Sequence, residues 1–358
     1  MEVYNLNFIK NNEYFNYIAD GYTLLGSQLQ PEFIYNASSN TQFRVGLFLL
    51  KNFGTPNVSK GIPVLSFNYF KSHHTFSIGN LYARNNHNLI EPIMASEKIL
   101  TSDVLENGVE YIFDNNNVNF DFWLNWENYI KKNDNDREVF TLGVSGSVLL
   151  LKQKKHEISL PVQFIYYHKG GQINKKYRVE NNLDSILNFQ NKSLGIKYKY
   201  LINYSTSLGF EYYYLNQKIG TLINEFPFKS GYAHYFIASL ISKKIEFKLT
   251  YFTGNKFISA KGNDMFQSYS KKINNNYWNG VLDNRYVNHT EPRRKLLFAK
   301  FIYKKTLSKA ITLGFQGEGY YQLNDAVLNS LPFLKNKKNN FDYNYGIYLI
   351  FDDVFSFK

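Results

Sequence analysis

The sequence predicts an all-β fold, a transmembrane antiparallel up-and-down β-barrel of about 16 strands (roughly 14–18), with short periplasmic turns and long extracellular loops. Three observations support this prediction. Apolar and polar residues alternate along many segments, short and long connections alternate along the chain, and 30 tyrosines and 31 phenylalanines occur among 358 residues. The mean hydropathy is only −0.38, and no apolar run approaches the roughly 18 residues of a membrane helix. We expect residues 1–358 to form a single β-barrel domain.

The expected strands follow one another as hairpins. Residues 1–23 form an N-terminal segment in which the first strand is not defined, because 3–9 and 14–18 both fit a strand pattern. The hairpins that follow are 28–35 with 42–50, 64–70 with 75–81, 109–113 with 118–130, 139–151 with 157–167, 194–202 with 207–215, 232–241 with 245–252, and 297–303 with 311–323. Pro161 lies within one of these strands, and we expect a β-bulge there because a closed barrel has no free edge.

The last strand, in residues 341–357, shows a period of two. Tyr345 and Ile347 lie on one face of this strand, and Asn344 and Gly346 lie on the other. This alternation is typical of a strand with one apolar and one polar face.

The long connections between hairpins are 84–108, 168–193, 216–231, 253–295 and 324–340, whereas the turns within hairpins have a few residues. Transmembrane barrels show this alternation, with the long loops outside the cell. We expect 84–108 and 253–295 to narrow or cap the barrel. The candidate residues for this constriction or cap are Arg84, His87, Glu91, Glu97, Asp103 and Glu106.

The two faces of the expected strands predict two further sets of residues. Aromatic residues near the outer ends of the strands should form a girdle at the membrane interface. They are Trp126, Tyr129, Tyr166, Tyr212, Tyr214, Tyr251 and Tyr321. The polar faces supply candidates for lining the lumen or a channel: Arg44, Asp121, Trp123, Asn125, Glu127, Lys197, Lys199, Glu211, Glu246, Lys248, Lys300 and Glu318. Alternatively, these charges pair across strands and stiffen the wall.

The sequence contains no recognisable catalytic motif. The absence of cysteine excludes disulfides, thiolate metal sites and thiol catalysis. His87 and Glu91 have the spacing of a metal pair on a helix, but Pro92 disfavours that helix. We therefore expect that the chain is not an enzyme and that it binds no metal ion and no cofactor.

Three segments carry a resemblance to a known group of proteins. They are EYFNYIADGYTLLGSQLQPEFIY at 13–35, HNLIEP at 87–92 and FDFWLNWENYI at 120–130. The chain resembles bacterial outer-membrane β-barrels of porin-like size, and more narrowly a barrel group found in Bacteroidota. The aromatic terminal strand is similar to the strand that closes such barrels, although Lys358 follows the last phenylalanine. The resemblance implies the outer membrane of a Gram-negative bacterium and, because no signal peptide is visible, a mature sequence.

Two functions fit these expectations best, and a barrel enzyme and a soluble all-β binding protein rank below them. The first is a passive channel for small polar solutes. The alternative is a plugged accessory or structural subunit of a larger outer-membrane complex that binds a surface lipoprotein, lipopolysaccharide or glycan. The expected partners are the lipid bilayer, lipopolysaccharide and other outer-membrane proteins or surface lipoproteins. The net charge of +12 is spread over turns and loops, so we expect no nucleic acid partner.

Overall fold

In the computed structural model the chain forms a closed antiparallel barrel of 16 strands. The structure describes residues 1–82, 84–131, 134, 136–170, 186–221, 226–270, 277–278, 281–282, 289–323 and 340–355. The barrel strands are β1 (Glu2–Glu13), β2 (Tyr22–Asn36), β3 (Thr41–Asn52), β4 (Lys60–Lys71), β5 (His74–Tyr82), β6 (Leu105–Asp114), β7 (Val118–Asn128), β8 (Glu138–Gln153), β9 (His156–Gly170), β10 (Leu187–Asn203), β11 (Thr206–Thr221), β12 (Ser230–Ile241), β13 (Ile245–Asn255), β16 (Arg293–Thr306), β17 (Ile311–Gln322) and β18 (Phe341–Val354).

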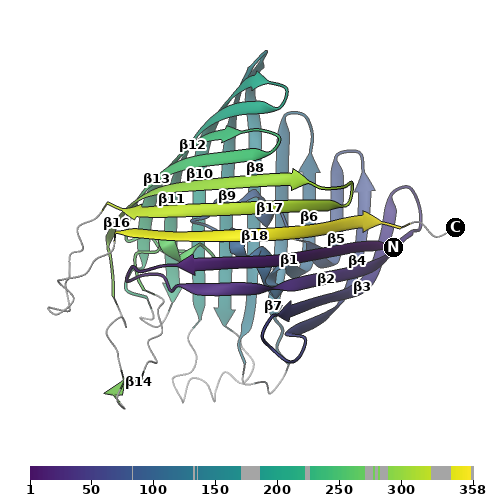
Figure 1. The fold of residues 1–358 in the computed structure, drawn as a ribbon, viewed down its shortest axis with the longest axis horizontal. Helices are drawn as coiled ribbons and strands as arrows, with labels where there is room; N and C mark the ends of the chain where they lie inside the picture. The colour runs from purple at the N-terminus through teal and green to yellow at the C-terminus, as the bar shows by residue number, and fades with distance from the viewer. Residues whose placement is uncertain are drawn as a thin grey trace.

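The barrel closes where the first and last strands meet. β1 pairs with β18 from Glu2 opposite Val354 to Glu13 opposite Tyr343, and Figure 1 shows these two strands side by side. The tight turns of the seven expected hairpins lie at the same end as the termini, and the longer connections lie at the other end. In outer-membrane barrels the end with the short turns is periplasmic, so the longer connections are extracellular. The predicted fold class and strand number are confirmed.

Side chains alternate between the outside and the inside of the barrel. In β18, for example, Tyr345 and Ile347 are exposed, whereas Asn344 and Asp342 between the outward positions are buried. The outward side chains are largely apolar and exposed, as a membrane-facing wall requires. None of the helices in the described part of the chain is long and apolar enough to cross a membrane.

Two segments between strands fold into the lumen and pack against each other; together we call them the plug. The first is residues 84–104, with the short 3-10 helices η1 (Asn86–Asn88), η2 (Ser96–Leu100) and η3 (Ser102–Val104). The second is residues 256–270, with η4 (Asp264–Phe266). A parallel bridge between Met94 and Lys261 joins the two segments, and the amide of Asn263 donates to the carbonyl of Glu91 at 3.0 Å.

An apolar core inside the barrel holds the plug to the wall. Plug residues Ile93, Met94, Met265 and Phe266 share one cluster with inward-facing wall residues of eight strands: Leu81, Trp123, Ile165, Tyr213, Leu215, Ala233, Tyr235, Ile237, Phe252, Leu296, Phe298 and Tyr320. On the opposite side Leu100 and Val104 pack with residues of β1, β3 and β4. The lumen of an open porin is polar. The apolar filling therefore distinguishes this barrel from an open porin.

Several boundaries differ from the predictions. The first strand extends to Glu13, and 14–18 lies outside any strand. β6 begins at Leu105, so Glu106 belongs to the wall and not to the preceding loop. A two-stranded pair, β14 (Tyr277–Trp278) and β15 (Val281–Leu282), lies within the expected loop 253–295.

The expected bulge at Pro161 is wrong. The β9–β10 register is the same on both sides of Pro161, where the pairing skips Leu160 and Pro161. The missing amide hydrogen of proline interrupts the ladder without adding a residue. The nearby bulge lies instead in β8, between Leu149 and Leu151.

Candidate functional site

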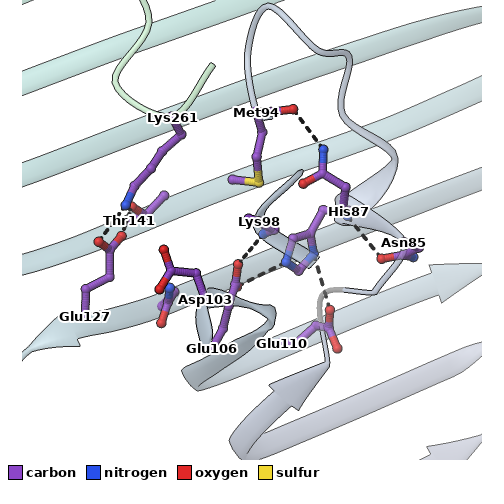
Figure 2. Close-up of polar contacts among 12 residues, drawn as sticks. Asn85, His87, Met94, Lys98, Asp103, Glu106, Glu110, Glu127, Thr141 and Lys261 are labelled. Atoms are coloured by element: carbon purple, nitrogen blue, oxygen red, sulfur yellow. Dashed lines mark hydrogen bonds and ion pairs between the residues drawn. The ribbon is translucent and has the colours of Figure 1, made fainter. Parts of the chain in front are cut away.

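The site is built around His87, a plug residue whose side chain is buried against the wall of β6 and β7. Its backbone sits in η1, where Asn86, His87 and Asn88 all have positive φ angles of 54°, 49° and 55°. Few residues other than glycine adopt this left-handed region, although Asn and His are enriched in it. The side chain of Asn85 accepts a hydrogen bond from the amide of His87 at 3.1 Å, which holds this turn in place (Figure 2).

Three carboxylates surround the His87 imidazole. Asp121 Oδ2 lies 2.9 Å and Glu110 Oε1 lies 3.5 Å from Nδ1. Glu106 Oε2 lies 3.1 Å from Nε2, and its other oxygen accepts from Lys98 Nζ at 2.7 Å. Figure 2 shows Glu106 between His87 and Lys98, with Glu110 on the other edge of the ring. Because β6 and β7 are paired, with Ile112 opposite Asp121, the wall brings the carboxylates together.

These carboxylates change the charge state of the imidazole. Burial by itself lowers the pKa of His87, but the hydrogen bonds and charges of Asp121 and Glu106 outweigh burial and raise this pKa to about 9. The surroundings of the His87 ring therefore stabilise a positive charge at neutral pH.

Trp123 fixes the orientation of the ring. Its indole stacks on His87 with centroids 3.7 Å apart and planes 3° apart. Trp123 is fully buried, and Gly143 of the neighbouring strand leaves the room that the indole occupies. A Cβ at Gly143 would lie 2.0 Å from Trp123 Cζ2, so no larger residue fits there unless Trp123 moves.

A polar cavity of about 540 Å³, which we call the mouth cavity, lies beside this cluster. Its wall residues come from the extracellular ends of β4, β6, β7 and β8, and its plug residues include Lys98 and Lys261. Glu106 lines the cavity and also contacts His87, so it connects the cavity with the cluster. On the other side Glu127 Oε2 accepts from Lys261 Nζ at 2.6 Å, and Thr141 Oγ1 donates to Glu127 Oε1 at 2.5 Å (Figure 2).

The residues predicted for the constriction or cap lie in the first plug segment, except Glu106, which lies in β6. Arg84 lies over the ring of Tyr4, with Cζ 3.7 Å from the centroid. Glu97 pairs with Lys10, and Asp103 lines the mouth cavity. Glu91 and His87 do not form the pair that a helix would give. Glu91 Oε1 instead accepts a hydrogen bond from the Ser96 hydroxyl and lies 3.7 Å from Lys300 Nζ. The backbone turn at η1 and Pro92 separate their side chains.

The predicted lumen residues lie on the inward faces of their strands, mostly in ion pairs. Asp121 and Trp123 join the His87 cluster, and Asn125 and Glu127 line the mouth cavity. The remaining pairs are Arg44 with Glu32 at 2.7 Å, Lys197 with Glu211 at 3.2 Å, Lys199 with Glu157 at 3.4 Å, Lys248 with Glu246 at 2.6 Å and Lys300 with Glu318 at 2.9 Å. This pairing is what the wall-stiffening alternative predicts; a role in lining a channel stays a prediction.

The predicted girdle residues lie on the outer face of their strands, except Tyr129, which follows the end of β7. Tyr212, Phe236, Tyr251, Leu297 and Tyr321 follow one another across the sheet in register. Trp126 stacks on Phe140 with centroids 5.4 Å apart, and Tyr129, Tyr214 and Tyr321 are exposed. Tyr166 Oη donates to Asn188 at 2.7 Å. Their contact with the membrane interface stays a prediction.

Four residues of the site were not predicted from the sequence: Glu110, Lys98, Thr141 and Lys261. Glu110 could have been found, because it shares strand parity with Glu106 and its strand is adjacent to that of Asp121. Lys261 could not, because its contact with Glu127 depends on how the second plug segment folds into the barrel.

Comparisons with proteins of known structure define the class of fold. The fold is that of an outer-membrane barrel. It is similar to OmpT, an outer membrane protein of Vibrio cholerae (TM-score 0.52, 9% identity, covering 99% of this chain and 97% of that chain). It is also similar to an anion-selective porin from Comamonas acidovorans (TM-score 0.52, 10% identity, 99% of each chain) and to Pseudomonas aeruginosa OpdL (TM-score 0.50, 9% identity, 98% of each chain). At these identities the likeness concerns the fold alone, and it confirms the predicted location in the outer membrane.

The family to which the chain belongs is more specific than its fold. A family model described as "Lipid A 3'-O-deacylase-type" matches residues 1–358, so the chain belongs to this family. No curated protein matches the chain. The family description is that of an enzyme, and it overturns the expectation that the chain is not an enzyme. That expectation rested on motif spacing along the sequence, which does not reveal groups brought together by the plug.

Proposed function

We propose that the chain is an outer-membrane hydrolase that removes an ester-linked acyl chain from lipid A, with the mouth cavity as its site. The observation that carries the proposal is this cavity, about 540 Å³ in volume, at the extracellular end of a barrel with a filled lumen. Its volume is within the range of small-molecule sites, roughly 300–1,000 Å³. The family description supports the choice of substrate.

Ester hydrolysis needs a base for the attacking water and a positive group near the developing oxyanion. In the proposal Glu127 is the base and Lys261, 2.6 Å from it, is the cation. Water adds to the ester carbonyl carbon while its proton passes to Glu127, and the oxyanion faces the Lys261 ammonium. When the carbon–oxygen bond to the sugar breaks, Glu127 returns the proton to the sugar oxygen. The products are a fatty acid and lipid A with one acyl chain fewer.

The lysines of the cavity are suited to contact with a phosphorylated glycolipid. Lys60, Lys98 and Lys261 line it together with the carboxylates Asp103, Glu106 and Glu127, and the whole chain carries a net charge of +12. Lipid A carries phosphate groups, and lysines bind phosphate as point charges. Contact with lipopolysaccharide, expected from the sequence, becomes part of this proposal.

A passive channel for small polar solutes is the competing proposal. The filled lumen counts against it, because the plug buries Ile93, Met94, Phe257, Met265 and Phe266. Burying each large apolar side chain contributes about 1.5–3 kcal/mol, so withdrawing the plug would be costly. The plugged accessory subunit shares the closed lumen, and only an assay for hydrolysis separates it from the enzyme.

The test measures fatty acid released from lipid A in mixed detergent micelles by purified wild-type protein, Glu127→Gln and Glu246→Gln. Glu246 is a matched control, since it is an inward carboxylate that pairs with Lys248 near the periplasmic end. We expect release by the wild type and by Glu246→Gln, and a loss of at least about 100-fold with Glu127→Gln, the lower range for removal of an acid–base group. If the folded wild type releases no fatty acid, or if Glu127→Gln is as active as the wild type, the proposal is wrong.

A further inference from the structure

We propose that His87, Glu110 and Asp121 bind one first-row divalent transition-metal ion, such as Zn²⁺, inside the barrel. The site would join the plug, which supplies His87, to the wall strands β6 and β7, which supply the two carboxylates. This inference goes beyond the proposed hydrolysis and does not depend on it.

The spacing of the donor atoms fits one ion. His87 Nδ1 lies 2.9 Å from Asp121 Oδ2 and 3.5 Å from Glu110 Oε1, and the candidate ligand atoms all lie within 4.8 Å of one another. Nitrogen and oxygen ligands lie about 2.0–2.2 Å from Zn²⁺, so tetrahedral ligands are about 3.4 Å apart. The two carboxylates therefore reach the ion with small movements of their side chains.

The kinds of donor select the class of metal. One imidazole with two carboxylates suits Zn²⁺ and its neighbours in the first row, whereas Ca²⁺ and Mg²⁺ prefer oxygen ligands alone. Three protein ligands leave a fourth tetrahedral position, which a water molecule can fill.

The second nitrogen of His87 has the partner that a metal-bound histidine requires. Metal-ligating histidines donate their other ring N–H to a carboxylate or carbonyl, which fixes the ring and increases its basicity. Glu106 Oε2 lies 3.1 Å from His87 Nε2 and is held on its far side by Lys98. Trp123 stacks on the ring and fixes its plane, so Nδ1 is held facing Asp121 and Glu110.

An unpartnered oxygen at the site points independently to a ligand. Asp121 is 6% exposed, and its Oδ1 is buried with no hydrogen-bond partner among the described residues. A buried carboxylate oxygen without a partner is costly. An ion that Asp121 binds through both of its carboxylate oxygens would provide the missing interaction.

The test uses the full-length protein in detergent after removal of metals with a chelator. Co²⁺ is added and its visible absorption is recorded, and Zn²⁺ binding is measured by calorimetry, both without lipid A. We expect one ion per chain in the wild type, and loss of the Co²⁺ spectrum in Asp121→Asn and in Glu110→Gln. Glu106→Gln should weaken Zn²⁺ binding by about 10–100-fold.

The matched control is Glu211→Gln, which changes an inward carboxylate that pairs with Lys197 at 3.2 Å; it should bind like the wild type. Retention of the heat-modifiable electrophoretic mobility of a folded barrel identifies the variants that can be compared. If one ligand variant does not fold, the other and Glu106→Gln decide. The proposal is overturned if the wild type binds neither ion with a stoichiometry of one, or if the folded ligand variants bind both ions as the wild type does. Because lipid A is absent, failure here does not bear on hydrolysis.

Discussion

At the scale of single residues, Trp123 and Gly143 hold the site together by close packing. The indole of Trp123 fills the space that a side chain at Gly143 would need, with 2.0 Å between Trp123 Cζ2 and a Cβ placed on Gly143. We predict that Gly143→Ala lowers the free energy of unfolding by about 1–3 kcal/mol, the usual cost of overpacking. Urea unfolding in lipid vesicles, followed by tryptophan fluorescence, measures the change.

The control for this prediction is Gly314→Ala. The nearest atom to a Cβ at Gly314 is 3.8 Å away, an ordinary contact, so this substitution in β17 should change the free energy of unfolding by less than the Gly143 substitution. Equal effects of the two substitutions would show that the packing around Trp123 is loose.

A second residue-scale prediction concerns Glu106, which contacts both His87 and Lys98 in a buried place. Removing one partner of a buried ion pair leaves the other charge uncompensated and costs about 3–5 kcal/mol. We expect Glu106→Gln to lower the free energy of unfolding by this amount at neutral pH. Glu157→Gln, whose Lys152 and Lys199 partners are exposed, should cost less than about 1 kcal/mol. The same unfolding experiment compares them, and a Glu106 effect no larger than that of Glu157 would contradict the buried network.

At the scale of elements, the plug depends on the contact between its two segments. The parallel bridge between Met94 and Lys261 places their backbones side by side, within the Cα separation that a disulfide allows. The chain has no cysteine, so Met94→Cys with Lys261→Cys introduces a single pair. We predict that this pair forms a disulfide under mild oxidation, seen as loss of both thiols in a thiol-reagent assay. Two thiols that remain free in the folded, oxidised protein would show that the segments do not meet.

The elements differ in how far the sequence predicts them. The strands follow from alternation, since each inward residue is flanked by outward ones, and the seven hairpins pair as expected. The plug does not follow from alternation. Its apolar residues Ile93 and Met94 are recognisable in the sequence, but their partners Met265 and Phe266 are distant in the chain. Nothing local distinguishes a segment that fills the lumen from one that caps the barrel.

The same reason limits prediction of the site. Asp121 and Glu127 are predicted to face inward by strand parity, and they do. The contact of Asp121 with His87 requires the register of β6 and β7 and also the left-handed turn at η1. The ion pair between Glu127 and Lys261 requires the second plug segment to lie inside the barrel.

At the scale of the whole molecule, the filled lumen predicts that the barrel conducts no ions. Apolar plug residues pack against wall residues on both sides of the lumen, so the protein should insert into a planar bilayer without steady open steps. Replacing residues 86–103 by a short glycine–serine linker should remove the first plug segment and produce steps in the folded barrel. Steady conductance of the wild type, unchanged by this replacement, would favour the passive channel.

The central claim is that this barrel hydrolyses lipid A, and the mass spectrum of lipid A tests it most directly. Wild-type protein is inserted into vesicles that contain lipid A, and the lipid is extracted after incubation. We predict a product lighter by one ester-linked acyl chain, with the fragment spectrum locating the loss at the 3' oxygen named in the family description. An unchanged lipid A spectrum, from protein with the electrophoretic mobility of a folded barrel, would contradict the claim.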